Sequence, residues 1–180
     1  MEHQKPQPET VFFARPAADI VVIRIDGRGS NLNSPAFQQV ADGCFAQNPK
    51  TRFIIDLENC PTMDSTFMGA LGGISRRQFR AGTGMTTVVN MSAQVHRLLE
   101  ILGLDQVLDL RQEPTGQPIP PVEGYEIGQP PELSRIERTI HMIQAHEELV
   151  SLDGQNEVRF EGVLQHLRQS LERQRSQESR

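Results

Sequence analysis

Residues 53–69 read FIIDLENCPTMDSTFMG, and this stretch decides the fold. It opens with a short, nearly continuous apolar run, which is typical of a central strand covered on both faces of a sheet. After a loop, Asp64 or Ser65 stands where the N-cap of a helix is expected. Apolar residues at helical spacing continue to a stop near Gly82. The stretch predicts a buried strand that leads into an α-helix with a hydroxyl side chain at its start.

The flanking sequence predicts the rest of an α/β domain. Residues 11–13 and 20–25 are β-branched and aromatic runs separated by a short turn, so they predict two strands. Ser34 and Pro35 then open a helix over residues 35–47. Residues 85–90 predict a strand, Ser92 caps a third helix that ends at Gly103, and residues 107–110 form a last strand. The order β, β, α, β, α, β, α, β predicts a mixed β-sheet with helices mainly on one face.

The C-terminal part of the chain has a different composition. We expect residues 1–9 to be a flexible N-terminus, 10–111 the domain, and 112–131 a proline-rich, extended linker. Beyond the linker, Ser134 and Glu137 form a capping box, and two apolar stripes follow at helical spacing. Residues 132–175 therefore predict a helical hairpin, which is expected to fold back on the domain, form a homodimer, or bind another protein.

Charge and hydropathy exclude several classes of protein. The net charge of −5 lies entirely in residues 112–180, with 12 acidic and 7 basic side chains, whereas residues 1–111 carry 11 of each. Without a basic excess, no nucleic-acid partner is expected. No apolar stretch is long enough for a membrane span or a signal peptide, so we expect a soluble, cytoplasmic protein. Cys44 and Cys60 fit buried thiols, and we expect no metal and no cofactor.

Residues 53–69 resemble the central motif of STAS domains, in which a buried strand and a short loop precede Asp-Ser-Ser/Thr at a helix start. Gly27 at the end of the second strand, Ser34-Pro35, and Gly103-Leu104 after Leu99 agree with that family. The resemblance covers about residues 10–111 and is to the anti-sigma factor antagonist type. It implies a STAS-like mixed sheet, a regulatory role and no enzymatic activity.

In that family, a partner serine kinase phosphorylates the first hydroxyl residue after the Asp, and the unphosphorylated form binds an anti-sigma factor. The resemblance thus implies that Ser65 is a phosphorylation switch, with Thr66 as the alternative. The implied partner is an anti-sigma factor or a serine kinase-type regulator. From spacing alone, a plain N-cap is the favoured interpretation of Ser65.

The partner-binding surface is expected around the switch. It would contain Asp64, Thr66, Phe67 and Met68, together with Arg28 and Ser30 of the loop after the second strand. Phe67 stands where the family usually has Gly, and Ser30 where it commonly has Asp. One of Phe67 and Met68 should be in the core, and we expect Phe67 to be the exposed one.

Two other functions compete with this interpretation. A groove beside residues 27–34 would make the chain a sensor for a nucleotide or lipid, and an unmodified Ser65 would indicate a constitutive scaffold. An enzyme with Cys60 or Ser65 as nucleophile is disfavoured because His96 is the only histidine between residues 4 and 140. His141 and His146 are five apart on the tail helix, so we expect both to be solvated.

Overall fold

The computed structural model describes residues 8–111 and 123–178. Its strands are β1 (Thr10–Ala17), β2 (Ile20–Asp26), β3 (Arg52–Asp56), β4 (Thr86–Val89), β5 (Leu108–Arg111) and β6 (Glu126–Ile127). Its helices are α1 (Ser34–Gln47), α2 (Ser65–Arg80), α3 (Ala93–Ile101), a short 3-10 helix (Leu104–Gln106), α4 (Arg135–Leu152) and α5 (Gly154–Glu178).

The strands form one mixed sheet in the order β5-β4-β3-β2-β1-β6. β2, β3, β4 and β5 run parallel to one another, and β1 lies antiparallel to both β2 and β6. Each parallel pair is joined through a helix, as parallel neighbours require. The predicted α/β fold with a mixed sheet is confirmed.

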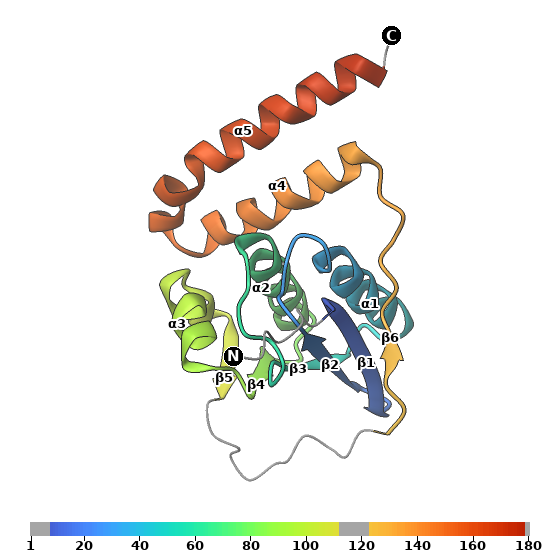
Figure 1. Cartoon of the computed structure of the whole chain (residues 1–180). Coiled ribbons are helices and arrows are strands. Elements are labelled where there is room, and N and C mark those ends of the chain that lie inside the picture. The colour runs from blue at the N-terminus through green and yellow to red at the C-terminus, as the bar shows by residue number, and fades with distance from the viewer. Residues whose placement is uncertain (1–7, 112–122, 179–180) are drawn as a thin grey trace, which may run out of the picture.

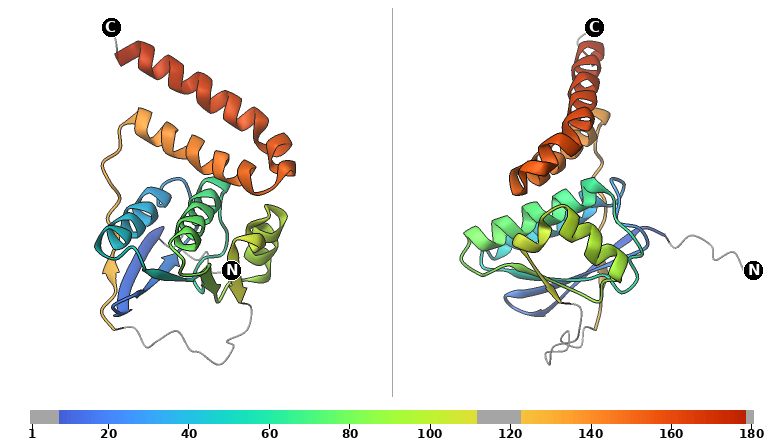
Figure 2. Two further views of the ribbon diagram at one scale, coloured as in Figure 1. Left: turned by 180° about the vertical axis from the view of Figure 1, so that it is seen from behind. Right: turned by 90° about the vertical axis from the view of Figure 1, so that its left-hand side faces the viewer.

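The molecule is built in layers (Figures 1 and 2). α1, α2 and α3 lie on one face of the sheet, α4 crosses above them, and α5 lies outermost. The expectation that β3 is covered on both faces was wrong. Phe53 and Ile55 point to the helices and are fully buried, but Ile54 points to the other face and is only half-buried.

The core lies between the sheet and the first helical layer, and it includes Phe67. The ring of Phe67 stacks on that of Phe37 from α1, with ring centroids 4.9 Å apart, and Phe67 is 0% exposed. Met68 is also buried. The expectation of an exposed Phe67 was wrong, because Gly29 lies directly over the ring and the first turn of α2 packs against α1.

Part of the predicted linker is an element of the sheet. β6 pairs with β1 through Phe12–Ile127 and Phe13–Glu126, and the amide of Gly128 donates to the carbonyl oxygen of Val11 at 2.8 Å. The expectation of an unstructured connection was therefore wrong for this part. Residues 112–122 lie outside the described residues.

The tail forms the predicted hairpin, and it folds back on the domain. The capping box of Ser134 and Glu137 opens α4 as expected. Leu149 of α4 is fully buried in the same apolar core as the sheet, and Leu152 and Phe160 pack against that core. The hairpin is thus packed as part of the body.

This packing predicts that α4 contributes to the stability of the whole chain. Leu149→Ala should lower the free energy of unfolding by about 2–5 kcal/mol, because it removes a buried side chain and leaves a cavity. Val158→Ala, at a position 80% exposed on α5, is the control and should change it by less than about 0.5 kcal/mol. Urea unfolding measures both. An unchanged unfolding transition for Leu149→Ala would show that the tail unfolds separately.

Candidate partner-binding site at the start of α2

Asp64, and not Ser65, caps α2. Its carboxylate accepts a hydrogen bond from the amide of Phe67 at 2.9 Å and a second one from the amide of Asn31 at 2.8 Å. The first bond caps the helix, and the second ties the helix start to the loop after β2. Ser65 is the first residue of α2, so its hydroxyl has no capping role. The interpretation of Ser65 as a plain N-cap was wrong.

The loops after β2 and β3 lie side by side, as the resemblance implies. Gly29 and Met63 form a bridge, the amide of Gly29 donates to Thr62, and the amide of Asp64 donates to the carbonyl of Gly29 at 2.8 Å. The sheet explains this contact, because β2 and β3 are parallel and their carboxyl ends meet at one edge.

The expected site residues are not equally accessible. Arg28 is exposed and Asp64 and Ser65 are half-buried, while Thr66 and Met68 are buried. Ser30 is 3% exposed, and its hydroxyl donates to the carboxylate of Glu9. Arg28, Asp64 and Ser65 are therefore the members of the predicted surface that are not buried.

The hydroxyl of Ser65 is hydrogen-bonded to the tail. Its Oγ lies 2.8 Å from Nε2 of His146 on α4. The other ring nitrogen, Nδ1, lies 2.7 Å from the carbonyl oxygen of Met142. A carbonyl can only accept, so Nδ1 carries the hydrogen, and Nε2 of the neutral ring accepts the hydroxyl hydrogen of Ser65.

A second serine–histidine pair lies beside the first. Oγ of Ser34, at the start of α1, is 2.8 Å from Nε2 of His141. The sequence predicted Ser34 as the N-cap of α1, but Asn33 holds that position. The expectation of two solvated histidines was also wrong. Since α4 crosses both helix starts (Figure 1), residues five apart reach two different helices.

Glycines on α2 allow α4 to come this close. A Cβ atom on Gly69 would lie under 3.0 Å from the backbone of Ala145, a distance that real Cβ atoms do not show. Two turns further along α2, Arg76 pairs with Glu148 of α4 at 2.8 Å. Gly69, Gly72 and Gly73 follow one another at helical spacing, and this was the signal in the sequence for a helix packed on α2.

A cavity of about 530 Å³ lies next to the serine–histidine pairs. The loop after β2 contributes Asn31 and Leu32 to its lining, α1 contributes Pro35, and α4 contributes Arg138, His141 and Met142. Residues 129–133 close the third side. The cavity combines apolar walls with a guanidinium and an imidazole, and it lies beside the loop at residues 27–34.

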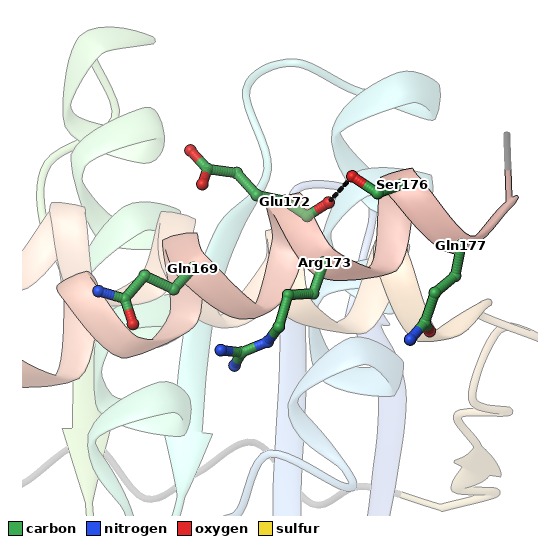
Figure 3. A pocket seen from close by; sticks show the side chains of 5 residues that line it. All are labelled: Gln169, Glu172, Arg173, Ser176 and Gln177. Atoms are coloured by element: carbon green, nitrogen blue, oxygen red, sulfur yellow. Dashed lines mark hydrogen bonds between the residues drawn. The ribbon is translucent and has the colours of Figure 1, made fainter.

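A second hollow lies on α5, the outermost helix (Figure 3). Gln169, Glu172, Arg173, Ser176 and Gln177 all project from this one helix, and Ser176 donates to the carbonyl oxygen of Glu172 at 2.9 Å. All five side chains are exposed. A hollow lined by one helix has no opposing wall to enclose a ligand, so it is not a candidate site.

Within residues 8–111 and 123–178, no cluster of His, Cys, Asp and Glu side chains could hold a metal ion. Cys44 and Cys60 are buried, free thiols, and burial raises the pKa of both. In the same described part of the chain, no helix has the length and apolar character needed to cross a membrane.

The family follows from this fold and this helix start. The model of the STAS domain family matches residues 14–115, more than half of the chain, and the chain belongs to that family. No curated protein matches the chain significantly.

Solved structures with the same fold include two proteins described as antagonists of anti-sigma factors. One is a candidate anti-sigma factor antagonist from Thermotoga maritima, with a TM-score of 0.51 and 19% identity over 58% of this chain and 88% of that protein. The other is the anti-sigma factor antagonist SpoIIAA in its unphosphorylated form, with a TM-score of 0.51 and 23% identity over 57% of this chain and 89% of SpoIIAA. These similarities show the fold.

The pairing of Ser65 with His146 changes the case against an enzyme. The sequence argument was that no histidine lies near Ser65 in the chain, but the fold brings His146 within 2.8 Å of it. Hydrogen bonding between a nucleophile and a base is one requirement of covalent catalysis, and access of substrate is another. His146, on the face of α4 that packs against α2, is only 4% exposed, so the pair, as it stands, offers a substrate no access.

The half-buried His141 predicts a pH dependence. Burial lowers its pKa below the usual value of 6.5, so the folded chain disfavours the protonated ring. The contribution of His141 to the free energy of unfolding should be fully present above about pH 6.5. It should decrease as the pH falls below that value, because the unfolded chain then binds more protons than the folded chain. The other charged side chains that line the adjoining cavity are Glu132 and Arg138.

The free energy of unfolding at pH 7.5, 6.5 and 5.5 tests this expectation. His141→Gln keeps a polar side chain but removes the titrating ring, so it should reduce the loss of stability between pH 6.5 and 5.5. The same pH dependence in both proteins would contradict the assignment to His141.

Proposed function

We propose that the chain is a phospho-regulated protein-interaction module of the anti-sigma factor antagonist type, with Ser65 as its switch. The observation that carries the proposal is the position of Ser65. It follows the capping Asp64 at the start of α2 of a STAS fold, and its hydroxyl has no structural duty in the helix. A partner serine kinase or an anti-sigma factor would act at this helix start.

Phosphorylation at this position is compatible with the fold. Oγ of Ser65 would attack the γ-phosphorus of ATP bound to the kinase, the bond to ADP would break, and a base of the kinase would take the hydroxyl proton. The phosphate would add about −1.5 to −2 charges. The exposed amides and the positive end of the α2 dipole favour a negative charge there, so the domain itself should stay folded.

The same charge would disrupt a partner interface. A surface that fits the neutral hydroxyl also accommodates the carboxylate of Asp64, so a phosphate would be desolvated beside a like charge. By analogy with truncated charge pairs at interfaces, binding should weaken by roughly 2–5 kcal/mol. Arg28 is the exposed cation of the neighbouring loop, and it is the side chain that would meet the phosphate.

Burial favours Ser65 over the alternative. Thr66 is 4% exposed, so a kinase would reach it only after α2 moved. Phe67 and Met68 are buried and would make no direct contact with a partner. In this proposal, contacts with the partner come from Asp64, Ser65 and Arg28, and Ser30 supports the loop.

One observation favours a second candidate function, a sensor for a small ligand. The cavity of about 530 Å³ lies beside the loop at residues 27–34, and Arg138 and His141 line it. Its apolar walls fit an amphiphile such as a nucleotide or a fatty acid, and Arg138, whose charge Glu132 of the same lining opposes, is the cation that would meet an anionic group. A rise in the melting temperature on addition of nucleotides or fatty acids would support this candidate.

The switch predicts a specific modification pattern. In the native cells, intact-mass and phosphopeptide analysis should find one phosphate on the peptide that contains Ser65. The phosphate should be lost in Ser65→Ala and retained in Thr66→Val, which is the matched control at the adjacent hydroxyl. Unmodified Ser65 under growth and stress conditions would contradict the switch and favour a scaffold or a ligand sensor.

A further inference from the structure

We infer that α4 is a built-in cover of the partner site, so that a kinase or a partner protein gains access to Ser65 only when α4 leaves α2. The effect of this cover on phosphorylation and partner binding rests on the proposed function of Ser65. The covering itself is a property of the packing, because α4 lies directly over the start of α2 (Figure 1) and hydrogen-bonds to the hydroxyl of Ser65.

The surface under α4 has three contact points. Gly69 receives the backbone of Ala145. One turn back along α2, the hydroxyl of Ser65 binds His146, and on α1 the hydroxyl of Ser34 binds His141. The three contacts use the N-terminal parts of two helices and the same face of α4. A helix from a partner that docked here would have to replace α4.

A phosphate on Ser65 and the docked α4 exclude each other. With Oγ and Nε2 only 2.8 Å apart, a phosphoryl group cannot take the place of the hydroxyl hydrogen unless Oγ or His146 moves. After phosphorylation Oγ also has no hydrogen to donate, and His146 loses the bond that holds it at the helix start. Phosphorylation therefore opposes docking of α4, and docking of α4 opposes phosphorylation by the same free energy.

The contacts of α4 differ along its length. Leu149 in its C-terminal half is part of the apolar core, which holds that half firmly. His141 lies in the N-terminal half and contacts α1 through a hydrogen bond, which water can replace at small net cost. His146 lies in the C-terminal half, three residues before Leu149, and its ring also packs edge-on against that of Phe160 on α5. The N-terminal part of α4, over Ser34, is thus the part that leaves more easily, and access to Ser65 requires movement of the C-terminal half as well.

The reactivity of a thiol at position 65 tests the cover without any kinase. Ser65→Cys places a thiol under α4, while Cys44 and Cys60 are buried and should react slowly with the Ellman reagent. Adding Gly69→Ala introduces a Cβ that collides with Ala145. Alanine is a better helix former than glycine, so α2 itself is not weakened.

Gly73→Ala is the matched control, because it makes the same change one turn along α2. A Cβ there would lie 3.5 Å from the side chain of Glu148, an ordinary contact. We expect Gly69→Ala to speed the reaction of the introduced thiol roughly tenfold or more, since the population of the open state governs the reaction of a covered group. Gly73→Ala should leave the rate unchanged. Equal rates with and without Gly69→Ala would overturn the inference.

A second pair of measurements keeps the inference falsifiable if Gly69→Ala fails to fold. In the Ser65→Cys protein, His141→Ala together with His146→Ala removes both hydrogen bonds without adding volume, and the thiol should again react faster. In the full-length protein made with phosphoserine at position 65, the amides of α4 should exchange hydrogen faster than in the unmodified protein. Unchanged thiol reactivity or unchanged exchange in α4 would overturn the inference.

The two proposals fail in different experiments. An unphosphorylated Ser65 in cells would remove the proposed switch, but it would leave the thiol reactivity of the variants as expected. A thiol that reacts freely in the wild-type background would remove the cover and leave the phosphorylation of Ser65 untouched.

Discussion

The missing side chain at Gly69 permits every other contact of the tail with the start of α2. Because no Cβ stands between them, the backbone of α4 at Ala145 rests directly on α2. At that separation His146 reaches Ser65 and Glu148 reaches Arg76. Leu149, one turn after Ala145 on α4, enters the core. A larger side chain at position 69 would move α4 outward and weaken these contacts together.

The sheet explains why one helix can contact two serines. β2 and β3 are parallel neighbours, and each leads through a loop into a helix on the same face. Ser34 and Ser65 therefore start two adjacent helices at one edge of the molecule, and Asp64 joins the two loops through the amide of Asn31. A helix laid across this edge meets both hydroxyls, which is what α4 does. The pair of sites follows from the topology of the parallel strands.

The sequence predicted what local chemistry determines. Strands, helix starts and the capping box of Ser134 follow from periodicity and capping, and they are confirmed. Burial of Phe67 depends on Phe37 and Gly29, which are distant in the chain. The partners of His141 and His146 depend on where α4 docks, and no periodicity encodes that position. The glycines of α2 were a readable sign that a helix would pack there, but they do not identify which helix.

A cover that competes with a partner also sets the affinity that is observed. When only a fraction of the molecules has α4 displaced, the apparent dissociation constant equals the intrinsic one divided by that fraction. Side chains that touch no partner then control the response, because Leu149 and the Arg76–Glu148 pair hold α4 in place. Protonation of the half-buried His141 would act in the same way, since it weakens the docked state and raises the open fraction. The tail would thus determine the partner concentration at which the site at Ser65 becomes occupied.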